Sequence, residues 1–239
     1  MTKTGTTCFC DIGLFHHHEV LDQLQRVGLR EITGRGYLVD KESNEVPPDW
    51  KGDWKKRLYA GSHDEFSRTI GGMLSRYRGL FNSRIRMWVT LEGISTCSGD
   101  LCLGAKRLAQ EYGVGICYHD ASSIEEAKVS ERETGEWRTC HLNSIGMLGP
   151  NRLAVHAPIV KDEEVDMLAR HDVKMAHCPS AAMRIGKGVA RWGCGYRVPY
   201  SFPFVSREVF AHALDVGLPL VWQDVFHLLF RSDRFRFRE

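Results

Sequence analysis

The chain has 239 residues, of which 43% are hydrophobic and 26% charged, and its 32 basic side chains nearly balance its 30 acidic ones. These values are ordinary for a globular protein, and they exclude a disordered tail protein, a coiled coil and a collagen-like repeat. The formal net charge of +2 creates no long-range field for nucleic acid or an anionic membrane surface, so we expect neither partner.

Neither the apolar segments nor the cysteine spacing indicates a location outside the cytoplasm. No stretch approaches the roughly 18 apolar residues that span a bilayer, and the start lacks the pattern of a signal peptide. The eight cysteines form no CxxC pair, so we expect free thiols in a cytoplasmic protein rather than disulfides or a structural zinc knot.

Strand-like and helix-like segments alternate along the first 180 residues. In chain order they are strand 6–14, helix 18–28, strand 30–39, helix 64–79, strand 84–94, helix 101–113, strand 113–119, helices 123–135 and 141–148, strand 152–160, helix 162–172 and strand 173–179. This order implies right-handed crossovers and a parallel sheet. Because no glycine-rich dinucleotide loop follows any strand, the order favours an α/β fold of the incomplete (β/α)8 TIM-barrel type over a Rossmann sheet.

The composition changes near Gly195. Residues 195–239 contain ten aromatic residues, six arginines and no lysine, and the last ten show no convincing periodicity. We therefore divide the chain into a barrel domain over 1–194 and a divergent tail over 195–239. A shifted reading frame or a truncated gene is the hypothesis for this tail.

Three successive predicted strands end in histidine, at His119, His156 and His177. In a parallel barrel the catalytic groups project from the carboxyl ends of the strands, and converging imidazoles can hold a divalent metal. The alternative is that each histidine caps its strand by hydrogen bonding to nearby backbone. Cys117, on the same strand face as His119, would need an adjacent base to act as a nucleophile.

Two segments resemble the amidohydrolase superfamily. LGPNRLAVHA (148–157) and AHCPSAAMRIGKG (176–188) are similar to its branch of S-adenosylhomocysteine/methylthioadenosine deaminases and chlorotriazine hydrolases, and Gly5-Thr6-Thr7 resembles the opening of that branch's second barrel strand. The resemblance covers about residues 4–190 and is strongest over 113–188, so the chain would supply strands two to seven of the barrel.

The resemblance implies hydrolysis of a non-peptide C–N bond, with deamination of a purine- or triazine-like amine by metal-activated water. By order along the chain, His119 matches a metal ligand and His156 matches a catalytic histidine. The residues that would shape the substrate pocket are His177, Ser180, Met183 and Arg184. The family implies zinc or iron as the cofactor and a small-molecule amine as the partner.

The sequence also departs from the family pattern. It lacks the HxH pair of strand one and a recognisable strand-eight Asp turn, and Ser122 stands where many relatives have a proton-shuttling Glu. Because a catalytic zinc needs about three protein ligands, we expect the metal to be weakly held and the activity to be impaired.

Two alternatives to an impaired hydrolase remain open. The first is a non-catalytic remnant, or small-molecule-binding pseudoenzyme, that keeps the pocket without the metal. The second is a cytosolic α/β domain whose strand-end histidines are all structural. An unclosed barrel exposes strand edges, so pairing into a homo-oligomer is compatible with either.

Overall fold

Helices and strands alternate through the computed structural model, which describes residues 8–14, 17–35, 40, 62–93, 96–176 and 178. The elements are β1 (Cys8–Leu14), α1 (His17–Val27), β2 (Arg30–Arg35), α3 (His63–Arg76), the short 3-10 helix η2 (Leu80–Ser83), β3 (Ile85–Met87), β4 (Val89–Gly93), α4 (Gly99–Tyr112), β5 (Ile116–Asp120), α5 (Ile124–Thr134), α6 (Arg138–Ser144), β6 (Arg152–His156), α7 (Asp162–Arg170) and β7 (Lys174–Ala176). The divergent tail predicted over 195–239 lies outside the described residues, so the proposed domain division stays a prediction.

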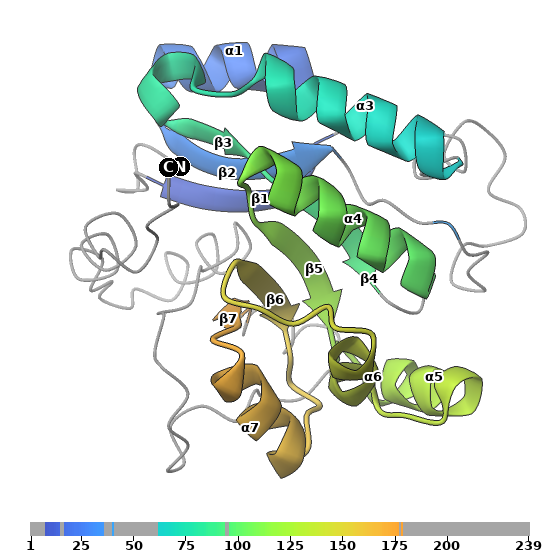
Figure 1. Ribbon diagram of the computed structural model, residues 1–239. Helices are drawn as coiled ribbons and strands as arrows, with labels where there is room; N and C mark the ends of the chain where they lie inside the picture. The colour runs from blue at the N-terminus through green and yellow to red at the C-terminus, as the bar shows by residue number, and fades with distance from the viewer. Residues whose placement is uncertain are drawn as a thin grey trace, which may run out of the picture.

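All the paired strands run parallel, in two sheets of order β1-β2-β3 and β4-β5-β6-β7. Helices α1, α3 and α4 lie over one face of the strands, and α5, α6 and α7 follow β5 and β6 (Figure 1). This arrangement confirms the predicted α/β barrel class, and among the described strands the barrel is not closed.

The segment predicted as one strand over 84–94 is broken at Trp88 into β3 and β4. The amide of Trp88 donates to the carbonyl of Thr33 in β2 at 2.7 Å, whereas the amide of Val89 donates to the carbonyl of Gly115 ahead of β5 at 3.1 Å. The prediction of one uninterrupted strand is therefore wrong at Trp88, because pairing passes there from β2 to β5. This short segment joins the two sheets.

The second short helix, predicted over 141–148, instead spans Arg138–Ser144. Its first turn forms earlier because the Glu164 carboxylate accepts hydrogen bonds from the amides of Thr139 and Cys140, at 2.9 and 3.3 Å. It ends before Gly146, whose φ of 70° is left-handed.

Serine and glycine caps define several of the helix boundaries. The side chains of Ser62, Ser98 and Ser123 accept hydrogen bonds from amides in the first turns of α3, α4 and α5. Gly113 and Gly135 end α4 and α5 in the left-handed conformation that glycine adopts without steric cost.

The strands bury apolar side chains on both faces, as parallel strands do. On one face, residues of β3, β4, β5 and β6 pack against α1, α3, α4 and α7 in the larger cluster. The opposite, inner face carries a smaller cluster, whose buried members are Ile32, Trp88, Cys117, Leu153, Val155, Ala176 and Cys178. Several cysteines thus serve as small apolar side chains, and the seven in the described part of the chain carry free thiols.

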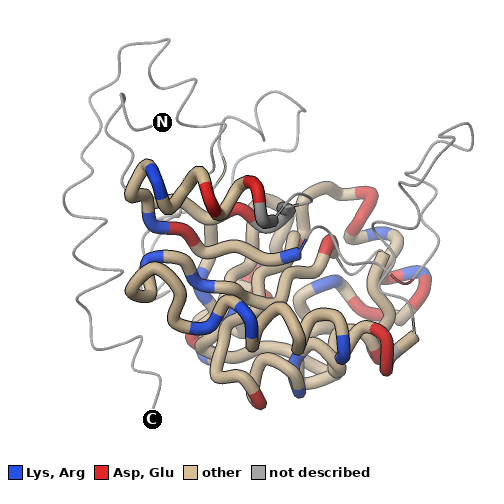
Figure 2. Tube along the Cα trace, turned by 90° about the horizontal axis from the view of Figure 1, so that it is seen from above, with Lys and Arg blue, Asp and Glu red and all other residues tan. Residues whose placement is uncertain are grey.

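Basic and acidic residues are interspersed along the described chain (Figure 2). No helix in this part of the chain is long and apolar enough to cross a membrane.

Gly34 is required for the close approach of β2 to the β3–β4 segment. A Cβ atom there would lie 2.8 Å from the Trp88 carbonyl oxygen and would also collide with the Thr90 side chain. We expect Gly34→Ala to lower the free energy of unfolding by about 1–3 kcal/mol, the usual cost of overpacking. The measurement is urea denaturation. Gly72→Ala is the matched control, since its Cβ would meet no atom within 4 Å and should stabilise α3 by about 0.5–1 kcal/mol.

Glu31 makes stability depend on pH. Its side chain is 1% exposed, and neither carboxyl oxygen has a hydrogen-bond partner among the described residues. Burial, with a further contribution from Asp11, raises the pKa of Glu31 from 4.5 to about 8. Because the folded state holds this proton more tightly than the unfolded chain, stability should fall as the pH rises from about 4.5 to about 8. Glu31→Gln should flatten this slope in denaturation curves recorded across that range; an unchanged slope would assign it to other groups.

Candidate functional site

His119 and His156 lie side by side at the carboxyl ends of neighbouring strands. In the β5–β6 register Asp120 pairs with His156, and the two imidazole rings stack with centroids 5.2 Å apart and planes 11° apart. The expectation that these two histidines share one end of the sheet is confirmed. The roles assigned to them stay predictions.

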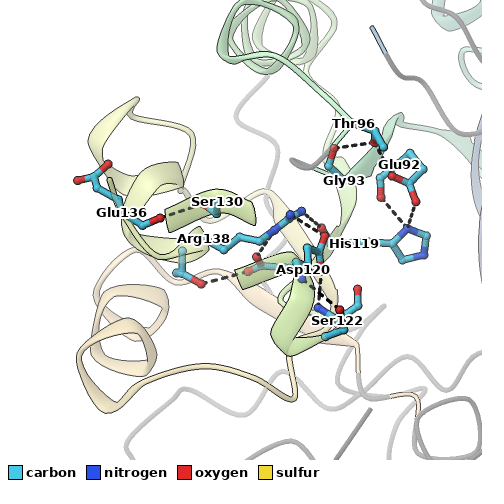
Figure 3. A network of polar contacts seen from close by, with 12 residues as sticks. Glu92, Gly93, Thr96, His119, Asp120, Ser122, Ser130, Glu136 and Arg138 are labelled. Carbon is cyan, nitrogen blue, oxygen red and sulfur yellow. Dashed lines mark hydrogen bonds and ion pairs between the residues drawn. The ribbon is translucent and has the colours of Figure 1, made fainter. Parts of the chain in front are cut away.

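The backbone of β4 fixes the ring of His119. Its Nδ1 lies 2.6 Å from the carbonyl oxygen of Glu92 and 3.8 Å from a carboxylate oxygen of the same residue (Figure 3). Since a carbonyl oxygen can only accept, Nδ1 must carry the proton in this hydrogen bond. In the neutral ring, the lone pair that could bind a metal is therefore on Nε2, an arrangement typical of metal-binding histidines.

A strained backbone brings His156 onto the same side as His119. Val155 belongs to the inner cluster, so regular alternation would turn His156 to the opposite face of the sheet. Instead His156 has a φ of 80° and Ala157 a φ of 44°, both left-handed and both unfavourable for residues with a Cβ. The amide of Ala157 donates to the Asp120 carbonyl at 2.9 Å, which holds the turn against β5. Strain of this kind concentrates at functional sites.

A buried arginine contacts the side chain and the backbone at the carboxyl end of β5. Arg138, at the start of α6, is 1% exposed and pairs through Nε with the Asp120 carboxylate at 3.2 Å. Its Nη1 lies 2.6 Å from a Glu126 carboxylate oxygen, a close charge contact without hydrogen-bond alignment. Its Nη2 donates to the main-chain oxygen of His119 at 2.8 Å, so the guanidinium holds the histidine's own backbone (Figure 3).

The carboxylates of this group are held by further contacts. Glu126 accepts the amide of Ser122 at 2.7 Å, so the residue that replaces the family's Glu shuttle is tied to the first turn of α5. Burial raises the pKa of Asp120 to about 6 against the opposing effect of Arg138. Asp120, the residue after His119 in β5, points to the opposite side of the sheet, as alternation along a strand requires.

The sequence alone did not indicate that Arg138, Glu126 and Glu92 surround the end of β5. Glu126 looks like an ordinary acidic residue in the first turn of a helix, and Arg138 falls in a polar stretch without an apolar pattern. The four residues expected to shape the substrate pocket (His177, Ser180, Met183 and Arg184) lie outside the described residues, so their placement stays a prediction.

The donors fit a divalent cation only in part. The His119 ring stacks on the His156 ring, and a Glu92 carboxylate oxygen lies 3.8 Å from Nδ1 of His119. Among the described residues, however, no group of three or more His, Cys, Asp and Glu side chains could hold a metal ion. The described residues therefore do not by themselves form a metal site.

Comparison with known proteins identifies the origin of this arrangement. Residues 1–192 match the amidohydrolase family over most of the chain's length. The chain belongs to the amidohydrolase family.

Its relatives include deaminases. The 5'-deoxyadenosine deaminase of Methanopyrus kandleri is 29% identical over 188 residues, covering 79% of this chain and 39% of the relative. The 5-methylthioadenosine/S-adenosylhomocysteine deaminase of Thermococcus sibiricus is 30% identical over 189 residues, covering 79% and 40%. This amidohydrolase chain thus spans about two-fifths of the length of the curated relatives it matches.

Solved structures show the same fold. An adenosine deaminase from Xanthomonas campestris with bound zinc aligns with a TM-score of 0.65 at 18% identity, covering 79% of this chain and 39% of that one. Atrazine chlorohydrolase from Arthrobacter aurescens, complexed with zinc, aligns with a TM-score of 0.65 at 18% identity, covering 90% and 44%. The resemblance that the sequence showed to this family is confirmed.

Replacing Arg138 should show how much its buried guanidinium contributes to stability. Arg138→Met leaves two buried carboxylates without their partner, so we expect the free energy of unfolding to fall by about 3–5 kcal/mol. Arg132→Met is the matched control, because Arg132 is exposed on neighbouring α5 and should change stability little. Chemical denaturation measures both. A double-mutant cycle with Glu126→Gln should show coupling between the two sites, and strict additivity would contradict the pairing.

Proposed function

We propose that the chain acts in the hydrolysis of a non-peptide C–N bond, the deamination of a purine- or triazine-like amine. The observation that carries this proposal is the stacked pair of His119 and His156 at the carboxyl ends of β5 and β6, in a chain whose relatives are named as deaminases. In such a reaction water adds to the ring carbon that bears the amine, and ammonia leaves.

Each histidine has a role that its surroundings support. His119, oriented by the Glu92 carbonyl, would hold a divalent metal, zinc or iron, through Nε2; such an ion supplies a water of lowered pKa. His156 would orient the attacking water or stabilise the charge that develops on the substrate, a contribution of about 10²-fold or more for a positioned donor.

His177, Ser180, Met183 and Arg184 are proposed as the residues that contact the amine substrate, on the basis of the family resemblance. The amide of Ser122 donates a hydrogen bond to Glu126 in the first turn of α5, and the Ser122 side chain has no carboxylate. Proton transfer would therefore use water or another group, which favours a slow reaction. We also propose that the protein works in the cytoplasm, with a small-molecule amine as its partner.

A second function is favoured by one observation, the incomplete ligand set of the described residues. A chain that keeps the pocket but holds metal weakly would bind an amine-bearing ring without hydrolysing it. Metal stoichiometry and ligand affinity separate this candidate from the enzyme.

The test is ammonia release from a panel of aminopurines and aminotriazines, with zinc, manganese or iron added to the full chain. We expect slow, metal-dependent release that is abolished by His119→Ala and by His156→Ala. His171→Ala is the matched control, because His171 is exposed in the turn after α7 and should leave the rate unchanged.

Zinc content after dialysis reports the metal role separately from the rate. His119→Ala should lower the zinc bound per chain, whereas His156→Ala should remove activity with a smaller effect on metal. Turnover that survives both substitutions would place the chemistry elsewhere. Tight binding of an aminopurine without ammonia release would favour the binding protein.

A further inference from the structure

A cavity lies at the opposite end of the strands from the two histidines. Its volume is about 280 Å³, and it is bordered by the start of β3, by Gly113 and Val114 ahead of β5, and by the carboxyl end of α3. His119 and His156 stand instead where β5 and β6 finish. The cavity therefore belongs to a site separate from the proposed catalytic end.

The walls of this cavity are apolar and partly aromatic. Leu74, Tyr77, Ile85 and Trp88 line it and are each at most 6% exposed, so a ligand that enters meets side chains already withdrawn from water. The Trp88 ring is fixed by Gly115, where a Cβ would lie 2.6 Å from a ring atom. Flat, rigid walls of this kind favour a planar, apolar ligand body.

The mouth of the cavity is basic. Arg78, which is exposed, and Arg86, which is partly buried, both line it. They belong to a stretch with five arginines and no acidic residue between Glu65 and Glu92. Among the described residues, no acidic side chain lines the cavity. Guanidinium groups at an apolar opening favour a carboxylate.

A strained turn forms part of the same mouth. Phe81, Asn82 and Ser83 have φ values of 55°, 56° and 57°, three consecutive non-glycine residues in the left-handed region, and Gly79, two residues before Phe81, has a φ of 71°. Gly79 and Ser83 both border the cavity. Such strain persists only where surrounding contacts hold it, and it clusters at ligand clamps.

We propose that this cavity binds a single-ring aromatic carboxylate, with the ring against Trp88 and Tyr77 and the carboxylate between Arg78 and Arg86. The volume stands at the lower end of the range for small-molecule sites, so it limits the ligand to about one ring. This site is independent of the proposed hydrolysis, since it shares no residue with the histidine end.

The probe is 4-fluorobenzoate, whose binding to the full chain is followed by ¹⁹F NMR line broadening. We expect saturable binding that weakens as salt is added, because the contact is between opposite charges near the surface. The neutral analogue 4-fluorobenzyl alcohol has almost the same shape and should bind at least about tenfold more weakly, as expected for the loss of a charged hydrogen-bond partner.

Variants locate the site. Arg78→Gln and Arg86→Gln should each weaken 4-fluorobenzoate binding about tenfold, and circular dichroism melts verify that both variants fold. Arg78 is exposed, so its replacement tests the site even where Arg86→Gln is unstable. Arg68→Gln, exposed on α3 and outside the lining, is the matched control, and His156→Ala tests whether the probe occupies the histidine end.

Four results would overturn the proposal. The first is no binding at millimolar probe. The second is equal affinity for the acid and the alcohol. The third is affinity lost in His156→Ala but kept in both arginine variants. The fourth is displacement of the probe by inorganic phosphate, with the aromatic ring contributing nothing to the affinity. That result would identify a simple anion site and would reject the aromatic carboxylate.

Discussion

The buried guanidinium of Arg138 ties α6 to the carboxyl end of β5. It lies between the carboxylates of Asp120 and Glu126, and it also reaches the main-chain oxygen of His119. A charge removed from water is tolerated only when partners surround it, so these groups hold one another in a single arrangement. The position of His119, and with it the geometry of the proposed site, depends on this group.

The histidine pair shows how parallel strands and local strain combine. Parallel pairing brings the carboxyl ends of β5 and β6 together, but regular alternation would leave the two imidazoles on opposite faces. The left-handed backbone at His156 removes that difference and allows the rings to stack. The hydrogen bond from Ala157 to Asp120 connects this turn to the residue that Arg138 binds. The strained backbone at the end of β6 is thus held in place by the ion-paired residues at the end of β5.

The two ends of the strands differ in chemistry. At the carboxyl end, the stacked imidazoles of His119 and His156 stand beside the carbonyl and the carboxylate of Glu92. At the amino end, buried aromatic side chains and arginines border a cavity that contains no carboxylate in its lining. Between the two ends, the inner face is filled by apolar side chains and cysteine thiols, which separate the two regions.

The sequence by itself determined the class of the fold, the order of its elements and the family. Apolar periodicity and glycine or serine boundaries are local properties, so the strands and helices could be predicted to within a few residues, and His119 and His156 could be singled out from their positions at predicted strand ends. Tertiary structure alone decided the rest. Trp88 ends one pairing and begins another because its neighbours in space come from β2 and the approach to β5. Arg138 is buried because carboxylates from β5 and α5 meet there, and His156 reaches His119 through a φ value that no local pattern specifies. These features arise from contacts between residues distant in the chain, which composition and spacing do not encode.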